Sequence, residues 1–265
     1  MSRQEGEGEH LLATTFQRTI TAEVPVDAIP SYQPVLCRIT QALREKSRLL
    51  VTFVNPSTTV LLRRDRSAGL FDQFDVVAPD GIAMAIAVRW LYHVPAARIS
   101  FDSTSLAPDV FRLAVAHQAR VVLCGGRPGV AEQAQQQLQA AFPGLQIVKV
   151  YDGYAERSTT IEAIRQLAPE IVICGMGGLV QERFLLSLTN SGWCGVGFTC
   201  GGYLDQLSKG LEYYPTIIDR LNLRWAYRLF KEPRRLWRRY LLDYPVFAIS
   251  VGKALLSSSR THDQH

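Results

Sequence analysis

The sequence predicts an α/β fold, in which a Rossmann-like parallel sheet carries helices on both faces and a basic amphipathic helical appendage follows at the C-terminus. Short apolar runs rich in β-branched residues alternate with helical segments of roughly ten to fifteen residues, the pattern of βαβ units. The runs are apolar throughout, as in strands buried on both faces of a sheet. Most of them end in turns containing glycine, proline or asparagine, where a helix can begin.

The first half of the chain supplies an amphipathic helix and two strand–helix units. Residues 27–46 combine a turn with a helix whose apolar side chains recur at helical spacing. The strand expected at residues 48–54 ends at Asn55-Pro56, a pair typical of a helix start. A second strand, at residues 74–78, ends at Pro79-Asp80-Gly81. The other elements expected here are helices ending near residue 65 and spanning residues 82–92 and 106–118.

The second half continues the same strand–turn–helix order. The expected strands are at residues 120–124, 145–150, 170–174 and 195–200, and the expected helices include residues 130–142 and 158–167. This makes six or seven strands in all. In an open α/β sheet, ligands bind at the carboxyl ends of the strands, so the turns after these strands are the places to look for functional side chains.

Composition divides the chain into three parts. Residues 1–25 are expected to form a flexible tail, because the first residues are rich in glycine and glutamate and contain no apolar run. Residues 26–214 form the α/β core and residues 215–265 the appendage. The start lacks the basic and apolar regions of a signal peptide. No run approaches the ~18 apolar residues that span a membrane. We therefore expect a cytoplasmic protein.

Positive charge is concentrated in the appendage. The chain has a net charge of +5, yet residues 220–240 hold eight Lys or Arg and one Glu, so the rest is slightly acidic. A solvated helix face, a nucleic-acid site and an anionic membrane surface are all compatible with such a segment. We favour the membrane surface, because tryptophans and tyrosines are interleaved with the arginines, and we expect no nucleic-acid partner. Peripheral association with the inner face of the plasma membrane follows.

Cysteine and histidine usage argues against disulfides and metal sites. The five cysteines form no CxxC pair, and most lie in or beside strand-like runs, as expected of reduced core residues. The five histidines are scattered and show no metal-ligand spacing. The residues do not determine the oligomeric state, and a homo-oligomer is compatible with them.

Two turns carry the strongest candidates for chemistry. Asp80 follows a strand, where it could act as a general base or could cap the next helix. Gln181 and Glu182 follow the glycine turn after residue 174, where they could hold a sugar or phosphate oxygen. They could equally be ordinary first-turn residues, which the helix dipole favours when acidic.

Three further positions have weaker signals. Gly125 begins a Gly-Gly-Arg-Pro-Gly run that could cradle a phosphate at a helix start, although a plain tight turn explains it as well. Tyr154 could stack on a base or could simply pack. Asp205 could bind ribose hydroxyls, as acidic residues near strand ends do, or cap a helix.

Taken together, the motifs resemble the WecG/TagA/CpsF glycosyltransferase family over residues 30–242. Each motif is weak alone, and their order and spacing make the resemblance specific. They are Val54-Asn55-Pro56, Asp80-Gly81, Gly125-Gly-Arg-Pro-Gly-Val-Ala-Glu132, Phe142-Pro-Gly-Leu145, Gly153-Tyr154, Gly175-x-Gly-x-x-x-Gln181-Glu182, Gly201-Gly-x-x-Asp205 and Leu223-x-Trp-x-Tyr-Arg-Leu-x-x-Glu-Pro-Arg-Arg235.

The resemblance implies an inverting transferase that needs neither metal nor cofactor. The donor would be a UDP-sugar and the acceptor a saccharide linked to a polyprenyl diphosphate. The product would contribute to an extracellular polysaccharide or a cell-wall glycopolymer. The residues leave open which sugar is transferred and to which acceptor.

The resemblance also assigns roles to individual residues. Asp80 matches the proposed base, and Thr52 and Asn55 line the same pocket. Arg98, Gln181 and Asp205 match residues of the donor pocket. The arginine-rich appendage closes over the donor diphosphate and meets the membrane, and we nominate for this a group that the sequence does not rank: Arg228, Arg234, Arg235 and Arg238.

Two departures from the family pattern stand out. The family usually has Gly-x-Asp after the arginine that matches Arg98, whereas this chain has Phe101 and then Asp102, one position early. Asp102 is therefore a candidate contact for the sugar or the acceptor with altered specificity. The family also usually has proline where this chain has Leu179, which predicts a different turn before Gln181.

Two rival functions stay compatible with the residues. A non-enzymatic adaptor with a Rossmann-like core would bind a membrane or a nucleic acid through the basic segment and would not bind UDP. A soluble enzyme that modifies nucleotide sugars would work without a lipid acceptor and without residues 215–265.

Overall fold

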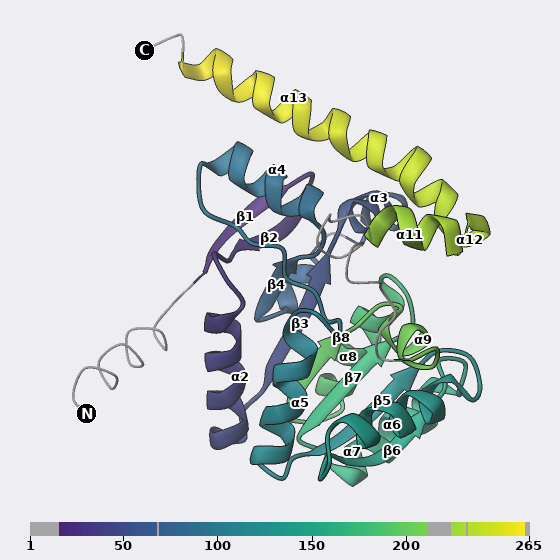
Figure 1. The fold of residues 1–265 in the computed structure, drawn as a ribbon. Helices are drawn as coiled ribbons and strands as arrows, with labels where there is room; N and C mark the ends of the chain where they lie inside the picture. Colours follow the sequence, from purple (N-terminus) through teal and green to yellow (C-terminus); the bar gives the residue numbers. More distant parts are fainter. Residues whose placement is uncertain (1–15, 68, 211–223, 232, 263–265) are drawn as a thin grey trace.

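The computed structural model describes residues 16–67, 69–210, 224–231 and 233–262 (Figure 1). Its centre is a six-stranded sheet in the order β4-β3-β8-β7-β5-β6, in which every pairing is parallel. This confirms the predicted fold class. The strands are β3 (Leu49–Val54), β4 (Val76–Pro79), β5 (Arg120–Gly125), β6 (Gln146–Tyr151), β7 (Ile171–Gly175) and β8 (Val196–Thr199).

Helices cover both faces of this sheet, because successive strand residues point to opposite sides. Leu49 and Val51 pack into one core, which receives apolar residues of the helices on its side, and Leu50 and Val54 pack into the other. The first core takes residues from α2 (Gln33–Glu45), α5 (Leu106–Ala116) and α6 (Val130–Ala141). The second takes residues from α3 (Pro56–Asp65), α4 (Ile82–Tyr92), α7 (Arg157–Leu167) and α8 (Val180–Asn190). Short elements complete the core: η1 (Phe71–Gln73) and α9 (Tyr203–Leu207).

An antiparallel hairpin precedes the parallel sheet and corrects the expected tail. β1 (Gln17–Thr21) pairs with β2 (Val24–Ala28) through a two-residue turn, in which Ala22 and Glu23 have positive φ. The prediction that residues 1–25 form a flexible tail is therefore wrong from residue 16 onward. Residues 1–15 lie outside the described part of the chain.

An ion pair between the partly exposed Arg18 and the buried Asp27 ties the hairpin to the main sheet. The Arg18 guanidinium donates to both carboxylate oxygens of Asp27, at 2.8 and 3.0 Å, and also to the Phe74 carbonyl. Asp27, which is 2% exposed, in turn accepts a hydrogen bond from the Val77 amide of β4 at 2.7 Å. The turn residues Ala22 and Glu23 are not the Asn-Gly or Asp-Gly pairs that usually mark a two-residue hairpin, which is why the sequence pattern did not reveal it.

The described part of the appendage consists of α11 (Arg224–Lys231), α12 (Pro233–Arg238), the π-helical turn η2 (Arg239–Asp243) and α13 (Tyr244–His262). Pro233 begins α12. The chain then continues into α13, which runs along the molecule beside α4 (Figure 1) and buries Phe247 and Val251. None of the helices in the described ranges is long and apolar enough to cross a membrane.

The hairpin anchor can be tested with Asp27→Asn. The asparagine keeps the shape of the side chain. Its amide nitrogen, however, would lie against hydrogen-bond donors that face a carboxylate oxygen in the wild type. Hydrogen bonds to charged groups contribute about 1.5–3 kcal/mol, so we expect the free energy of unfolding in urea to fall by about 2 kcal/mol. Asp109→Asn, at an exposed helical ion pair with Arg112, is the matched control and should change it by less than about 0.5 kcal/mol. Equal effects of both substitutions would contradict the anchor.

Candidate active site

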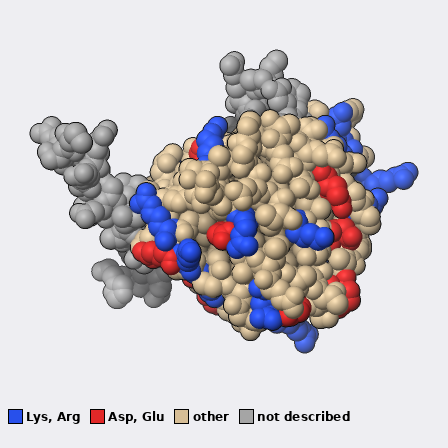
Figure 2. Space-filling view, turned by 90° about the horizontal axis from the view of Figure 1, so that it is seen from below, with Lys and Arg blue, Asp and Glu red and all other residues tan. Residues whose placement is uncertain are grey.

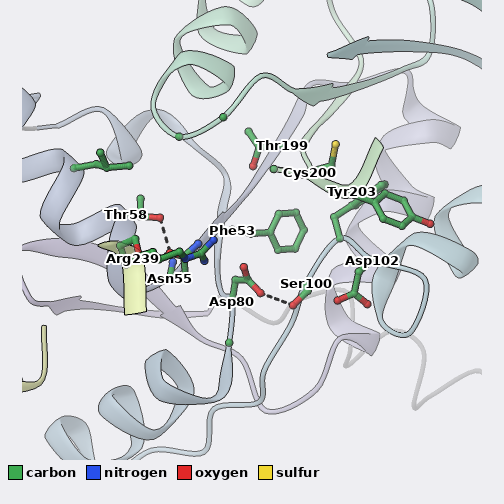
Figure 3. A pocket seen from close by; sticks show the side chains of 18 of the residues that line it. Phe53, Asn55, Thr58, Asp80, Ser100, Asp102, Thr199, Cys200, Tyr203 and Arg239 are labelled. Atoms are coloured by element: carbon green, nitrogen blue, oxygen red, sulfur yellow. Dashed lines mark hydrogen bonds between the residues drawn. The ribbon is translucent and has the colours of Figure 1, made fainter. Parts of the chain in front are cut away.

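A cavity of about 450 Å³ opens at the carboxyl edge of the sheet (Figure 3), within the usual size range of small-molecule sites. Its walls come from the turns after β3, β4, β7 and β8 and from residues 98–102. The remaining wall is the appendage between Leu236 and Tyr244. The core and the appendage therefore build this cavity together.

Asp80 lies in the cavity directly after β4, with its backbone fixed by a hydrogen bond from its amide to the Val54 carbonyl at 2.8 Å. The Ser100 hydroxyl donates to Oδ1 of Asp80 at 2.5 Å (Figure 3). The cap of α4 is Gly81 with no side-chain cap bond, so the alternative of Asp80 as a helix cap is not what the structure shows. The carboxylate is held from one side and faces the cavity.

Ser100 was not identified from the sequence. It is 5% exposed and lies in an extended segment whose neighbour Ile99 donates to the Pro79 carbonyl at 2.9 Å. The Ser100 carbonyl accepts from the Leu106 amide at 3.2 Å. Only this pairing of a loop with the end of β4 brings the serine to Asp80, and nothing in the local sequence marks it.

Asn55 lines the cavity and also begins α3. Its side-chain oxygen accepts from the Ser57 amide at 3.1 Å, and the Thr58 hydroxyl accepts from the Asn55 amide at 3.3 Å. This reciprocal capping fixes the turn after β3. The structure therefore places Asn55 in the cavity, as expected, with a side-chain oxygen already engaged by the backbone.

Gln181, Glu182 and Thr52 form a buried network under the cavity floor. Gln181 accepts from the Gly201 amide at 3.1 Å and donates to Oε1 of Glu182 at 3.0 Å. The Thr52 hydroxyl lies 3.2 Å from the same Oε1 and 2.9 Å from the Thr199 hydroxyl. Thr52 is fully buried, so it supports the floor and does not line the cavity.

Burial sets the ionisation of Glu182. The side chain is 1% exposed, its second oxygen has no hydrogen-bond partner among the described residues, and desolvation raises the pKa of this carboxyl despite hydrogen bonds that lower it. Gln181 and Glu182 both border the cavity, and their hydrogen bonds are to other protein groups. These hydrogen bonds connect the first turn of α8 with β3 and with the turn after β8.

The departure at Phe101 has a clear structural outcome. Phe101 is 4% exposed and packs against Phe53, Phe198 and Tyr203, with ring centroids 6.1, 4.9 and 5.8 Å away. Asp102 pairs instead with Arg98 at 2.5 Å. Both partners of this ion pair border the cavity, so the positive charge of Arg98 is already balanced.

Besides Thr52, three expected site residues of the core lie outside the cavity lining: Gly125, Tyr154 and Asp205. A Cβ on Gly125 would be 2.3 Å from the Gly175 carbonyl oxygen, so the glycine allows the ends of β5 and β7 to approach. This favours the tight-turn interpretation over a phosphate cradle. Tyr154 is 76% exposed, and Asp205 lies in the first turn of α9. Ligand contacts of these residues stay predictions.

The nominated arginines divide into three cases. Arg238 borders the cavity, whereas Arg234 is exposed and does not. The side chains of Arg228 and Arg235 lie outside what the structure describes. Arg239, which was not nominated, borders the cavity, as does Tyr244. Burial raises the pKa of the Tyr244 hydroxyl to about 12, against the lowering effect of Arg239.

The cavity offers no metal-ligand cluster. Within the described ranges, no group of three or more His, Cys, Asp or Glu side chains could hold a metal ion. The cations that border the cavity are arginines of this chain.

The ionisation of Glu182 can be tested through stability. With a folded-state pKa above the unfolded value of about 4.5, the protonated carboxyl stabilises the fold at low pH, and this contribution is lost as pH rises through the folded-state value. Glutamine stays neutral. Glu182→Gln should therefore gain in urea midpoint relative to the wild type as pH rises from about 4.5 to about 8.

Glu162→Gln is the control for that experiment. Hydrogen bonds from Arg165 and Gln166 lower the pKa of this exposed carboxyl to about 2, so its contribution is constant at neutral pH and is lost only as pH falls toward that value. The control should follow the wild type in parallel over the same range. Parallel curves for Glu182→Gln as well would refute the raised pKa.

Comparison with known proteins shows which family has this architecture. The family described as "Glycosyl transferase WecG/TagA/CpsF family" matches residues 19–261. The chain is 30% identical over 206 residues to the UDP-Gal:alpha-D-GlcNAc-diphosphoundecaprenol beta-1,4-galactosyltransferase of Shigella boydii, covering 76% of this chain and 84% of that protein.

Two further relatives carry another name, N-acetylglucosaminyldiphosphoundecaprenol N-acetyl-beta-D-mannosaminyltransferase. The Bacillus subtilis protein is 29% identical over 220 residues, covering 79% of this chain and 81% of its own. The Staphylococcus aureus protein (strain MW2) is 24% identical over 250 residues, covering 91% and 96%. The family match takes in the hairpin, the parallel sheet and the appendage, and it rules out the non-enzymatic adaptor. The chain belongs to the WecG/TagA/CpsF family and is a glycosyltransferase.

Proposed function

We propose that this enzyme transfers a sugar from a UDP-sugar to a saccharide linked to a polyprenyl diphosphate, with inversion and without a metal ion. The observation that carries the proposal is Asp80, a carboxylate fixed by Ser100 in a cavity at the ligand-binding edge of the sheet. The relatives' names support the substrate classes, since they specify UDP-Gal and acceptors on diphosphoundecaprenol. The product would enter an extracellular polysaccharide or a cell-wall polymer.

In the proposed reaction Asp80 is the general base. Its carboxylate takes the proton from the attacking acceptor hydroxyl, whose oxygen forms the new bond to the anomeric carbon. The bond from that carbon to the β-phosphate oxygen breaks on the opposite face, and UDP leaves with the electron pair. Ser100 binds Oδ1, which orients the carboxylate so that Oδ2 is the oxygen that receives the proton.

The leaving diphosphate needs positive charge placed in advance. We propose that the appendage supplies it through the group of Arg228, Arg234, Arg235 and Arg238. Support comes from Arg238, which borders the cavity. The donor itself would lie over the floor that Gln181 closes, with Arg98 and Asp102 at its edge.

The same appendage offers an apolar surface for a bilayer. Leu241, Val246, Ile249 and Leu256 are 65%, 41%, 59% and 68% exposed, and no charged residue lies between Asp243 and Lys253. Trp90 on the neighbouring α4 is 61% exposed. On the face shown in Figure 2, by contrast, Lys and Arg alternate with Asp and Glu. We therefore propose that α13 rests on the inner face of the plasma membrane, where the acceptor lipid resides.

The base assignment is tested by Asp80→Asn. A general base contributes roughly 10²–10⁴-fold to rate, so turnover should fall by that factor while calorimetry shows nearly unchanged UDP affinity. UDP release would be followed with UDP-glucose, UDP-galactose and UDP-N-acetylmannosamine on a lipid-linked acceptor. Asp109→Asn on the exposed side of α5 is the control and should keep full turnover. Wild-type turnover in the Asp80→Asn enzyme would exclude this base.

Membrane contact is tested by Ile249→Asp in a sedimentation assay with vesicles of phosphatidylglycerol and phosphatidylcholine. The substitution removes an apolar side chain that the bilayer would bury and adds a charge. It should weaken vesicle binding by at least roughly tenfold. Val148→Asp, on β6, is the matched control at a 39% exposed position and should sediment as the wild type does. If Ile249→Asp also sediments unchanged, α13 does not contact the membrane. Full activity on a lipid-free acceptor would instead favour the soluble rival.

A further inference from the structure

The end of β3 presents a phenylalanine to the active-site cavity. Phe53 borders the cavity and is 8% exposed. The hydroxyl of its neighbour Thr52 lies 2.9 Å from that of Thr199 on β8. Its other neighbour, Val54, accepts a hydrogen bond from the Asp80 amide after β4. Figure 3 shows the ring of Phe53 between Asp80 and Thr199, so a phenyl ring separates the base from the floor of the cavity.

Phe101 extends this apolar surface, and further rings hold it in place. It also borders the cavity, and its ring meets that of Phe53 edge to face, with centroids 6.1 Å apart. Its contacts with Phe198 at 4.9 Å and Phe111 at 6.2 Å are to rings that do not border the cavity. We call Phe53 and Phe101 the aromatic wall. Because protein interiors are closely packed, the wall has no space into which it could retreat from a ligand.

The aromatic wall offers no hydrogen bonds to a ligand. A phenyl ring has neither a conventional donor nor a conventional acceptor. The polar residues on either side of Phe101 are engaged with other side chains: Ser100 donates to Asp80, and Asp102 pairs with Arg98. This part of the cavity therefore suits a ligand surface made of C–H groups.

The proposed function places the transferred sugar over this wall. The anomeric carbon has to lie between the acceptor hydroxyl, from which Asp80 takes the proton, and the departing diphosphate. Asp80 follows β4, and the floor closed by Gln181 reaches the turn after β8. Strand β3 lies between these two strands, and Phe53 is at its end. Carbon 2 of the sugar is bonded to the anomeric carbon, so its substituent lies in the same part of the cavity.

We propose that the aromatic wall restricts the transferred sugar to hexoses with a hydroxyl at carbon 2 and excludes 2-acetamido sugars. This inference rests on the proposed function and names its donor class. A hydroxyl is small and can rotate toward a partner, while the C–H groups of the sugar ring pack on phenyl. An acetamido group is larger and carries an amide donor and an amide acceptor. Phenyl rings cannot pair these groups, and burying them unpaired is unfavourable.

Calorimetry with matched donors tests the proposal. UDP-glucose, UDP-galactose and UDP-mannose are each compared with their 2-acetamido counterparts, so the members of a pair differ only at carbon 2. UDP alone is the reference for nucleotide binding. The wild type should bind its best hexose donor roughly 10- to 100-fold more tightly than the acetamido counterpart. The ratio of kcat/KM on a lipid-linked acceptor should favour the same member of the pair.

Alanine variants of the wall identify its contribution. Phe53→Ala and Phe101→Ala each open space beside carbon 2, so the preference should fall by roughly tenfold while the affinity for UDP alone stays at the wild-type value. Phe198→Leu is the matched control, because it removes a ring that packs on Phe101 without bordering the cavity. It should keep both the preference and the UDP affinity. The wild-type comparison needs no variant and tests the proposal by itself.

Three results would overturn the proposal. One is a wild type that binds an acetamido donor as tightly as its hexose counterpart, or more tightly. Another is an unchanged preference in both alanine variants with wild-type affinity for UDP. The third is an equal loss of preference in Phe198→Leu, which would assign the effect to core packing. A wild type that binds no UDP at all would instead refute the proposed function itself.

Discussion

The parallel arrangement of the six strands is the constraint on which the site depends. Parallel pairing sends every strand's carboxyl end to one edge, so the turns after β3, β4, β7 and β8 surround a single cavity although they lie far apart in sequence. The buried Thr52–Glu182–Gln181 network then links β3, the first turn of α8 and the turn after β8. Without that network the edge would have the right residues but no common floor.

Charge around the cavity is arranged by pairing most of it. Arg98 is balanced by Asp102, Arg64 faces Asp243, and the Glu182 carboxyl has a raised pKa because it is buried. Among the described residues, the charged groups that stay available at the cavity are the Asp80 carboxylate and the guanidinium groups of Arg238 and Arg239. An inverting transfer needs a proton acceptor on one side of the reacting carbon and positive charge near the departing diphosphate. The charged groups of the cavity that have no oppositely charged partner are therefore of the kinds that such a reaction can use.

The sequence predicted those features that local pattern determines. Helix Ile82–Tyr92, the helix start at Asn55-Pro56 and the placement of Asp80 at a strand end all follow from periodicity and turn residues, and the structure agrees. The hairpin turn at Ala22 and Glu23 lacks the residues that usually mark such a turn. The contacts of Arg18 with Phe74 and of Ser100 with Asp80 join residues far apart in the sequence. Contacts across such separations have no local signal. Arg239 was missed for another reason: several arginines lie close together in this segment, and the sequence does not rank them.

The π-helical turn η2 has a consequence for how the faces of the appendage are oriented. An α-helix advances about 100° per residue, and a π-turn accommodates one additional residue without breaking the helix. In this chain the turn sets the rotation about the helix axis between two parts of the appendage. One is the side that borders the cavity and carries Arg239, and the other is α13 with its two long faces. One of those faces packs on the core through Phe247 and Val251, and the other presents Val246 and Ile249 outward. The turn therefore sets the orientation of the cavity wall relative to the outer apolar face on one continuous helix.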